Sequence, residues 1–184
     1  MDKDYWKEAY KEFWEASSKK EEFVKELIEK ETGATVLEVG LGAGTEDFLS
    51  GSAADYGLTK GDADLYVVDS DAYVEVTGPN IKVNLSDTLW IRPDKVSNSF
   101  NKQKEGKGKL HAIVHIAEIK PDGKKAIRVI ILNKSFIEAY NRNEFKIIYP
   151  TIRGKQEKYL ELPPEHATII SFDRFLELLK QLKE

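Results

Sequence analysis

Hydrophobic residues recur along the chain with two spacings, one typical of helices and one typical of strands. Apolar positions three or four residues apart predict helices at 4–16, 18–31, 93–103, 135–141 and 171–182. Short runs rich in branched and aromatic residues predict strands at 34–39, 65–68, 73–76, 88–92, 111–118, 126–132, 145–149 and 159–162. The chain therefore mixes helices and strands, and its 184 residues predict a single domain, 1–184, with a sizeable core.

The first two predicted helices carry different apolar faces. The first has an aromatic stripe, which indicates core or dimer packing more than base stacking: Trp6, Tyr10, Phe13 and Trp14. In the second, Ser18 and Glu21 have the spacing of a capping box. Its apolar face follows with Phe23, Val24, Leu27 and Ile28.

A hairpin in the first half of the chain is the most informative pattern. Only four residues separate 65–68 from 73–76, so these strands must be antiparallel around a turn at Asp69-Ser70. Pairing Val68 with Asp71 places Asp64 opposite Glu75, with Cβ atoms about 5 Å apart on one face. The other face is wholly apolar and suits a core. Two facing carboxylates repel each other unless a cation lies between them, which predicts a divalent-metal site.

Composition narrows the class of protein. Charged residues make up 33% of the chain, Lys and Glu are abundant and Cys is absent, a bias typical of proteins from heat-loving organisms. The lack of Cys excludes disulfides and thiolate chemistry. No apolar run has membrane-spanning length and no leader is evident, so we expect a cytoplasmic protein that does not contact membranes. The net charge of −4 argues against non-specific coating of nucleic acid.

One motif points to a different class of enzyme. The glycine-rich stretch at 36–45 resembles the first motif of S-adenosylmethionine-dependent methyltransferases. That fold needs parallel strands alternating with helices, whereas the hairpin leaves no room for a helix between its strands. The methyltransferase stays a third hypothesis.

A second resemblance covers residues 20–132. A glutamate in a helix, Glu22, precedes a strand and a Gly51-Ser52 loop, and Asp64 and Glu75-Val76-Thr77 follow on the next two strands. This order resembles the PD-(D/E)XK nuclease superfamily, most closely the archaeal Holliday-junction resolvases. The resemblance implies a restriction-endonuclease-like α/β (α+β) core, with a central mixed sheet flanked by helices. The strand 88–92, the helix from Pro93 and the strand 111–118 complete it, and residues 133–184 form a C-terminal extension.

The resemblance assigns roles to individual residues. Asp64 and Glu75 would bind Mg²⁺ or Mn²⁺, with the carbonyl of Val76 as a further ligand. Glu22, or Glu26 in its place, would hold a second metal or a metal-bound water. The resemblance places Ser52 against the DNA backbone; lysines outside the family pattern that are further candidates for contact with DNA are Lys60, Lys82, Lys102 and Lys104. The implied activity is hydrolysis of phosphodiester bonds in DNA, with branched or junction DNA as a candidate substrate, by a homodimer held together by the Trp6–Trp14 stripe or the last helix.

Thr77 departs from the family pattern. It stands where the family has a lysine that orients the attacking water, and its hydroxyl supplies no positive charge. Lys95, near the start of the following helix, is the first candidate to replace that lysine, ahead of Lys60 and Lys82. The departure also favours an alternative, a nucleic-acid-binding or assembly protein that keeps the scaffold without the chemistry. His111 and His115 share one strand face and are interpreted as packing or surface residues.

Overall fold

The computed structural model describes residues 19–39, 63–152 and 154–183. Residues 19–32 form a helix, and the other helices are α3 (Pro93–Lys104), α4 (Lys134–Asn141) and α5 (Phe172–Lys183). The longer strands are β3 (Ala72–Thr77), β5 (Leu110–Ile119), β6 (Lys124–Ile131) and β10 (Tyr159–Leu162). The shorter ones are β1 (Val36–Glu38), β2 (Leu65–Val67), β4 (Leu89–Ile91), β7 (Lys146–Ile148), β8 (Thr151–Ile152), β9 (Lys155–Gln156) and β11 (Ile169–Ser171).

A mixed six-stranded sheet forms the centre, in the order β1-β2-β3-β5-β6-β11. Strands β3 and β5 are parallel, and each other neighbouring pair in this sheet is antiparallel. A parallel pair needs a long crossover, and here residues 78–109, which contain β4 and α3, provide it. The crossover sets α3 against the sheet beside β3.

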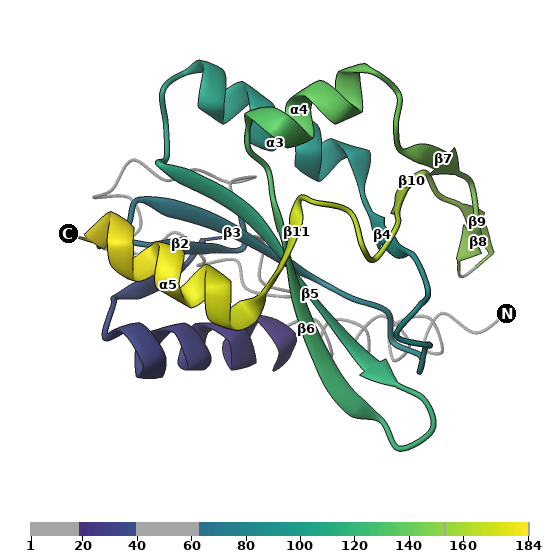
Figure 1. Ribbon diagram of the computed structural model, residues 1–184, viewed down its shortest axis with the longest axis horizontal. Coiled ribbons are helices and arrows are strands. Elements are labelled where there is room, and N and C mark those ends of the chain that lie inside the picture. The colour runs from purple at the N-terminus through teal and green to yellow at the C-terminus, as the bar shows by residue number, and fades with distance from the viewer. Residues whose placement is uncertain (1–18, 40–62, 153, 184) are drawn as a thin grey trace, which may run out of the picture.

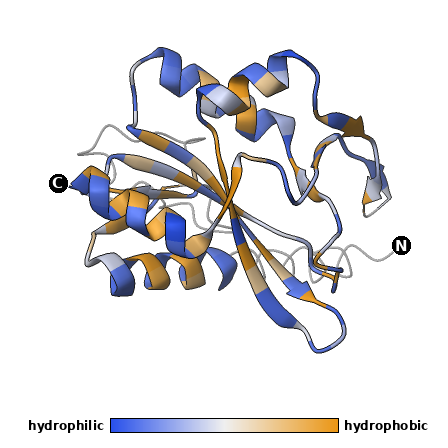
Figure 2. Ribbon diagram, viewed as in Figure 1, coloured by the Kyte–Doolittle hydropathy of each residue, from blue (hydrophilic) through white to orange (hydrophobic). Residues whose placement is uncertain are grey.

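Helices cover both faces of the central sheet (Figure 1). The helix at 19–32 and α5 lie together on one face, where Val24, Ile28 and Phe175 enter a core with Leu65 and Val74. On the other face, α3 and α4 enclose a second core. The apolar bands of α5 alternate with polar ones (Figure 2), as expected for a helix with one buried side.

The predicted hairpin register is confirmed. Leu65 pairs with Val74, Tyr66 with Tyr73 and Val67 with Ala72. Continuing this register by one residue places Asp64 opposite Glu75. Leu65, Val67 and Val74 lie in the first core, so the apolar face is also as predicted.

The strands β1, β2 and β3 are antiparallel neighbours, an arrangement that the methyltransferase fold does not have. The glycines of its proposed motif lie outside the described residues. The strand predicted at 88–92 forms as β4, but it pairs with β10 in a separate sheet of the order β4-β10-β7. Of the expected strand–helix–strand run, only the last strand, β5, therefore joins the central sheet, and α3 packs on it.

The C-terminal third completes the fold. The pattern at 169–171 suggested no strand, yet β11 adds to the central sheet beside β6. Ser171 caps α5, since its hydroxyl accepts a hydrogen bond from the Arg174 amide at 3.2 Å. The apolar side of α5 packs into the first core through Phe175 and Leu179, and the Trp6–Trp14 stripe lies outside the described residues. Among the helices described, none has the length and apolar character needed to cross a bilayer.

Candidate active site

Asp64 is held where β1 ends and β2 begins. Its carbonyl accepts a hydrogen bond from the Val39 amide at 2.9 Å. Its side-chain Oδ2 accepts one from the Val76 amide at 2.8 Å. The carboxyl group is thus fixed against β3, on the sheet face where the register also places Glu75.

Lys95 brings a positive charge to the Asp64–Glu75 pair. Its Nζ lies 3.1 Å from Oε2 of Glu75, and the Glu75 side chain is 12% exposed. Pro93 opens α3 at its first position, where the missing amide hydrogen costs nothing. Lys95 then lies in the first turn, beside β3. The sequence favoured Lys95 as the replacement for the lysine absent at Thr77, and the structure places it against Glu75.

A third carboxyl group belongs to Glu21, which sequence reasoning did not select. The Glu21 side chain is hydrogen-bonded to that of Asp64. Glu22 and Glu26, the predicted ligands, are exposed and are not brought to this cluster. The helical period contained the signal: Glu21 lies three and seven residues before the buried Val24 and Ile28, so it shares their inward face.

Two carboxyl groups of this acidic cluster, those of Glu21 and Glu75, favour the protonated form. Burial, followed by the charges of Asp64 and Glu38, raises the pKa of Glu21 to about 8. Burial and the neighbouring Asp64 raise the pKa of Glu75 well above its usual value, although Lys95 opposes this. Burial lowers the pKa of Lys95, but Glu75 and Asp64 outweigh it and the net shift is upward. Lys95 is therefore a cation near neutral pH.

A small cavity opens beside Glu75 and Lys95. Its volume of about 20 Å³ is comparable to the space that one water molecule needs. Its wall includes Tyr73, Asn98, Lys102 and His111. The rings of Tyr73 and His111 stack with centroids 5.1 Å apart, which gives the cavity a rigid side.

The remaining predicted residues have different positions. The Lys102 ammonium lies over the Tyr73 ring at 5.6 Å from its centroid, and Lys104 is exposed at the end of α3. Lys82 lies beside the turn between β5 and β6, near Gly123 and far along β5 from Glu75. Ser52 and Lys60 lie outside the described residues.

The arrangement has the donor chemistry of a Mg²⁺ or Mn²⁺ site, because carboxylate oxygens are the ligands that these ions prefer. In the described part of the chain, however, no group of three or more acidic or histidine side chains is arranged to hold a metal ion. A bound ion would require Asp64 and Glu75 to give up the hydrogen bond that they share.

Fold and site together define a mixed α/β protein with a partly buried acidic cluster and an adjacent lysine supplied by α3. Comparison of the chain with models of protein families, with curated proteins and with solved structures found no match.

Proposed function

We propose that this protein is a divalent-metal-dependent DNA endonuclease of the PD-(D/E)XK type. The observation that carries the proposal is the meeting of Asp64 and Glu75 across the hairpin, with the Lys95 ammonium 3.1 Å from Glu75. Two carboxylates and one lysine are the groups that such nucleases use. Glu21 adds the carboxyl group that the family takes from a helix before the first strand.

The order of elements supports a restriction-endonuclease-like core. A helix precedes three antiparallel strands, and a crossover containing α3 returns the chain to β5 parallel with β3. Asp64 precedes the second strand directly and Glu75 lies on the third, as in that family. Two differences are that β4 belongs to another sheet and that Glu21, rather than Glu22, faces Asp64.

Asp64 and Glu75 would hold the metal, and the nearby Glu21 would bind a water in its coordination shell. When bound, Mg²⁺ or Mn²⁺ lowers the pKa of a coordinated water and polarises the scissile phosphate. The chain's own part is to fix the carboxylates, which the Val76 amide does for Asp64. Lys95 would stabilise the negative charge that develops on the phosphate, the role for which Thr77 has no cation.

The direct test is to incubate the purified protein with Mg²⁺ or Mn²⁺ and with linear, nicked and four-way DNA. We expect cleavage that stops when Asp64 is replaced by Asn, a variant that retains an oxygen acceptor for the Val76 amide. Preference for four-way DNA, cut symmetrically on two strands, would support a homodimeric junction resolvase. If no DNA is cut, or if Asp64→Asn cuts as fast as the unaltered protein, the endonuclease proposal is wrong.

A second candidate is a protein that keeps this scaffold and binds DNA without cutting it. Two observations favour it: Thr77 in place of lysine, and the hydrogen bonds that the carboxyl groups make with one another. Calorimetric titration with Mn²⁺ separates the two. An endonuclease should bind the ion with an affinity that Asp64→Asn abolishes, whereas a binding protein should show no specific uptake.

A further inference from the structure

The small sheet β4-β10-β7 has one buried face and one exposed face. Its inward side chains lie in the second core and are at most 2% exposed: Leu89, Ile91, Leu160 and Leu162. Side chains alternate along a strand, so the residues between these lie on the opposite, outward face. One row across the outward face is formed by Trp90, Glu161 and Lys146. In the next row Tyr159 pairs with Ile148.

Two aromatic rings meet on this outward face. Trp90 is 41% exposed, and its ring centroid lies 5.9 Å from that of Tyr159. Single exposed apolar residues are common on protein surfaces, but here two rings in contact share one exposed sheet face. Aromatic side chains on an exposed sheet are a surface on which unpaired nucleic-acid bases stack.

The charges around the two rings are mostly positive. Residues 142–158 contain five basic and two acidic side chains, whereas the whole chain has a net charge of −4. Lys146, Lys155 and Lys158 are exposed, and none of them forms an ion pair with another residue in the described ranges. Such lysines complement the phosphates of a nucleic-acid backbone. Glu161 is the exception, a half-buried carboxylate between Trp90 and Lys146.

The outward face adjoins the proposed active site. Strand β4 leads directly into α3 (Figure 1). The Lys95 amide donates a hydrogen bond to the carbonyl of Arg92 at 3.2 Å, so the strand that carries Trp90 ends one turn before Lys95. A DNA strand that leaves the site past the start of α3 would therefore meet this face.

We infer that the outward face of β4-β10-β7 binds unpaired bases of DNA, which stack on Trp90 and Tyr159 while Lys146 contacts the backbone. The inference rests on the proposed function for its ligand and deepens it, because it makes DNA with a single-stranded segment beside the cut the substrate. The bases of an intact duplex are stacked on one another and present no free face to Trp90. Branched DNA with unpaired bases should therefore bind more tightly than linear duplex of the same length.

Substitutions of Trp90 test the stacking. Anisotropy of a labelled oligothymidylate, measured without divalent metal, reports binding while cleavage is prevented. Trp90→Leu should weaken this binding by about five-fold or more, the effect of losing one stacked base, whereas Trp90→Phe keeps a ring and should retain most of the affinity. Tyr149→Leu is the matched control, because it removes a ring that is 57% exposed but follows the inward position Ile147 by two residues. Linear duplex should bind Trp90→Leu and the unaltered protein equally.

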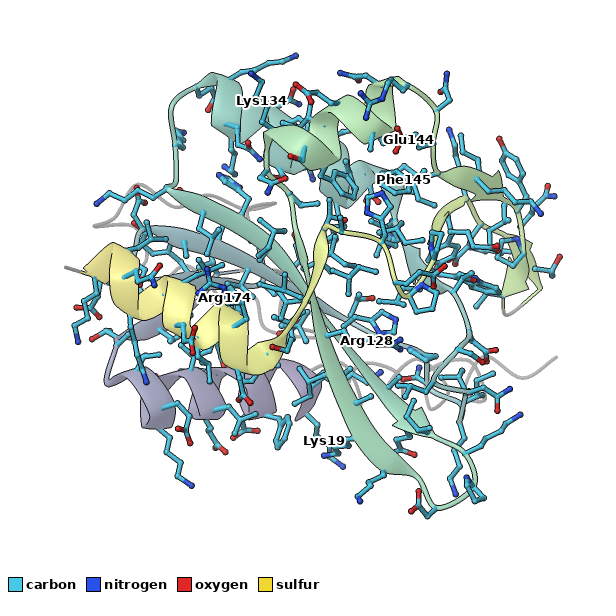
Figure 3. All side chains as sticks on the ribbon, viewed as in Figure 1. Lys19, Arg128, Lys134, Glu144, Phe145 and Arg174 are labelled. Carbon is cyan, nitrogen blue, oxygen red and sulfur yellow. The ribbon has the colours of Figure 1, made fainter. Side chains whose placement is uncertain are left out.

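Salt titrations test the charges and do not depend on the folding of Trp90→Leu. Lys146→Gln should reduce the slope of log affinity against log salt concentration by about 0.7, the value for one phosphate contact of a single strand. Glu161→Gln removes the negative charge of the same row and should tighten binding. Arg174→Gln is the control, since it removes a positive charge from α5, which Figure 3 shows well away from Phe145, the residue before β7, and it should leave the slope unchanged.

The outcomes separate this inference from the endonuclease proposal. Oligothymidylate binding that depends on Trp90, without cleavage of any DNA, would support the outward face as a binding site while the endonuclease proposal fails. Cleavage of DNA together with unchanged binding by Trp90→Leu and Lys146→Gln would overturn the inference and leave the endonuclease in place. Unchanged DNA binding with altered sedimentation of Trp90→Leu would also overturn it, and would assign the face to a second copy of the chain.

Discussion

Replacing Lys95 with Gln tests the central feature of the proposed site, a cation supplied by α3 instead of β3. At an effective dielectric constant of about 20, two unit charges 3.1 Å apart interact by about 5 kcal/mol. That figure describes Lys95 and Glu75; a phosphate oxygen at a similar distance would be attracted comparably, and only the charge that develops in the transition state speeds the reaction. Loss of one such electrostatic contact lowers catalytic rates by about 10²- to 10³-fold. We therefore expect single-turnover cleavage by Lys95→Gln to be slower by that factor.

The same substitution should have a smaller effect on folding. The Lys95 side chain is 34% exposed, so water screens much of the attraction, and Glu75 can take up a proton when its partner is lost. We expect a loss of about 1 to 2 kcal/mol in the free energy of unfolding, seen as a decrease of about 2 to 8 °C in Tm. Thermal denaturation at pH 7 measures this, and it shows that the cleavage assay reports on a folded protein.

Two further variants make the test sharp. Lys180→Gln removes the same charge from the exposed end of α5 and should change the cleavage rate by no more than a few-fold. Adding Thr77→Lys to Lys95→Gln should restore part of the activity, because position 77 lies on the same face of β3 as Glu75. If Lys95→Gln cuts DNA at the original rate, or if Lys180→Gln is equally impaired, the reasoning about Lys95 is refuted.

Three more predictions concern the Glu21 carboxyl group and the glycines that flank the site. Between pH 4.5 and about 8 Glu21 is ionised in the unfolded state but not in the folded state, so the free energy of unfolding of the wild type falls across this range. Glu21→Gln lacks that loss. Urea titrations at pH 5 and pH 8.5 should therefore show its free energy of unfolding rising relative to wild type by about 1 to 2 kcal/mol, a figure reduced for the partial exposure of the side chain. In cleavage assays Glu21→Gln should be impaired at least ten-fold and Glu22→Gln unaffected, and the reverse order would show that the predicted residue is the functional one. A Cβ at Gly78 would lie 1.8 Å from the Ile116 carbonyl oxygen, so Gly78→Ala should lower the free energy of unfolding by about 3 kcal/mol or more. A Cβ at Gly106 would meet nothing within 4 Å, so Gly106→Ala should lower it by only about 1 kcal/mol. Denaturant midpoints of the two variants measure the difference.

The hairpin shows what local rules can predict. Four residues between two strands leave one topology, and the turn fixes the register, so the pairing of Asp64 with Glu75 followed from spacing alone. The position of β4 could not be predicted from spacing, because Leu89 and Ile91 would fit either sheet. Only the tertiary pairing of β4 with β10 decides between the two sheets. The strand β11 was missed for a related reason. Three residues carry too little periodicity to be recognised, although their pairing with β6 adds an edge to the central sheet.

The candidate site could be predicted in part. Asp64 and Glu75 were found because cross-strand neighbours are fixed by counting. Glu21 was assigned to a capping box because the Ser18–Glu21 spacing fits one, and the family pattern then drew attention to Glu22. The helical period relative to Val24 and Ile28 would have corrected this, since a charged residue on the buried side of a helix needs a partner. The partner, Asp64, is more than forty residues away and is not visible from local spacing.

The source of the cation explains why the site depends on the second core. A lysine at position 77 would be held by the hydrogen-bond ladder between β3 and β5, whereas Lys95 is held by the packing of α3. Val96, next to Lys95, is fully buried with Ile113 and Phe136 and so fixes the rotation of α3 over the sheet. The distance between Lys95 and Glu75 therefore depends on that core, far more than it would with a lysine on the strand.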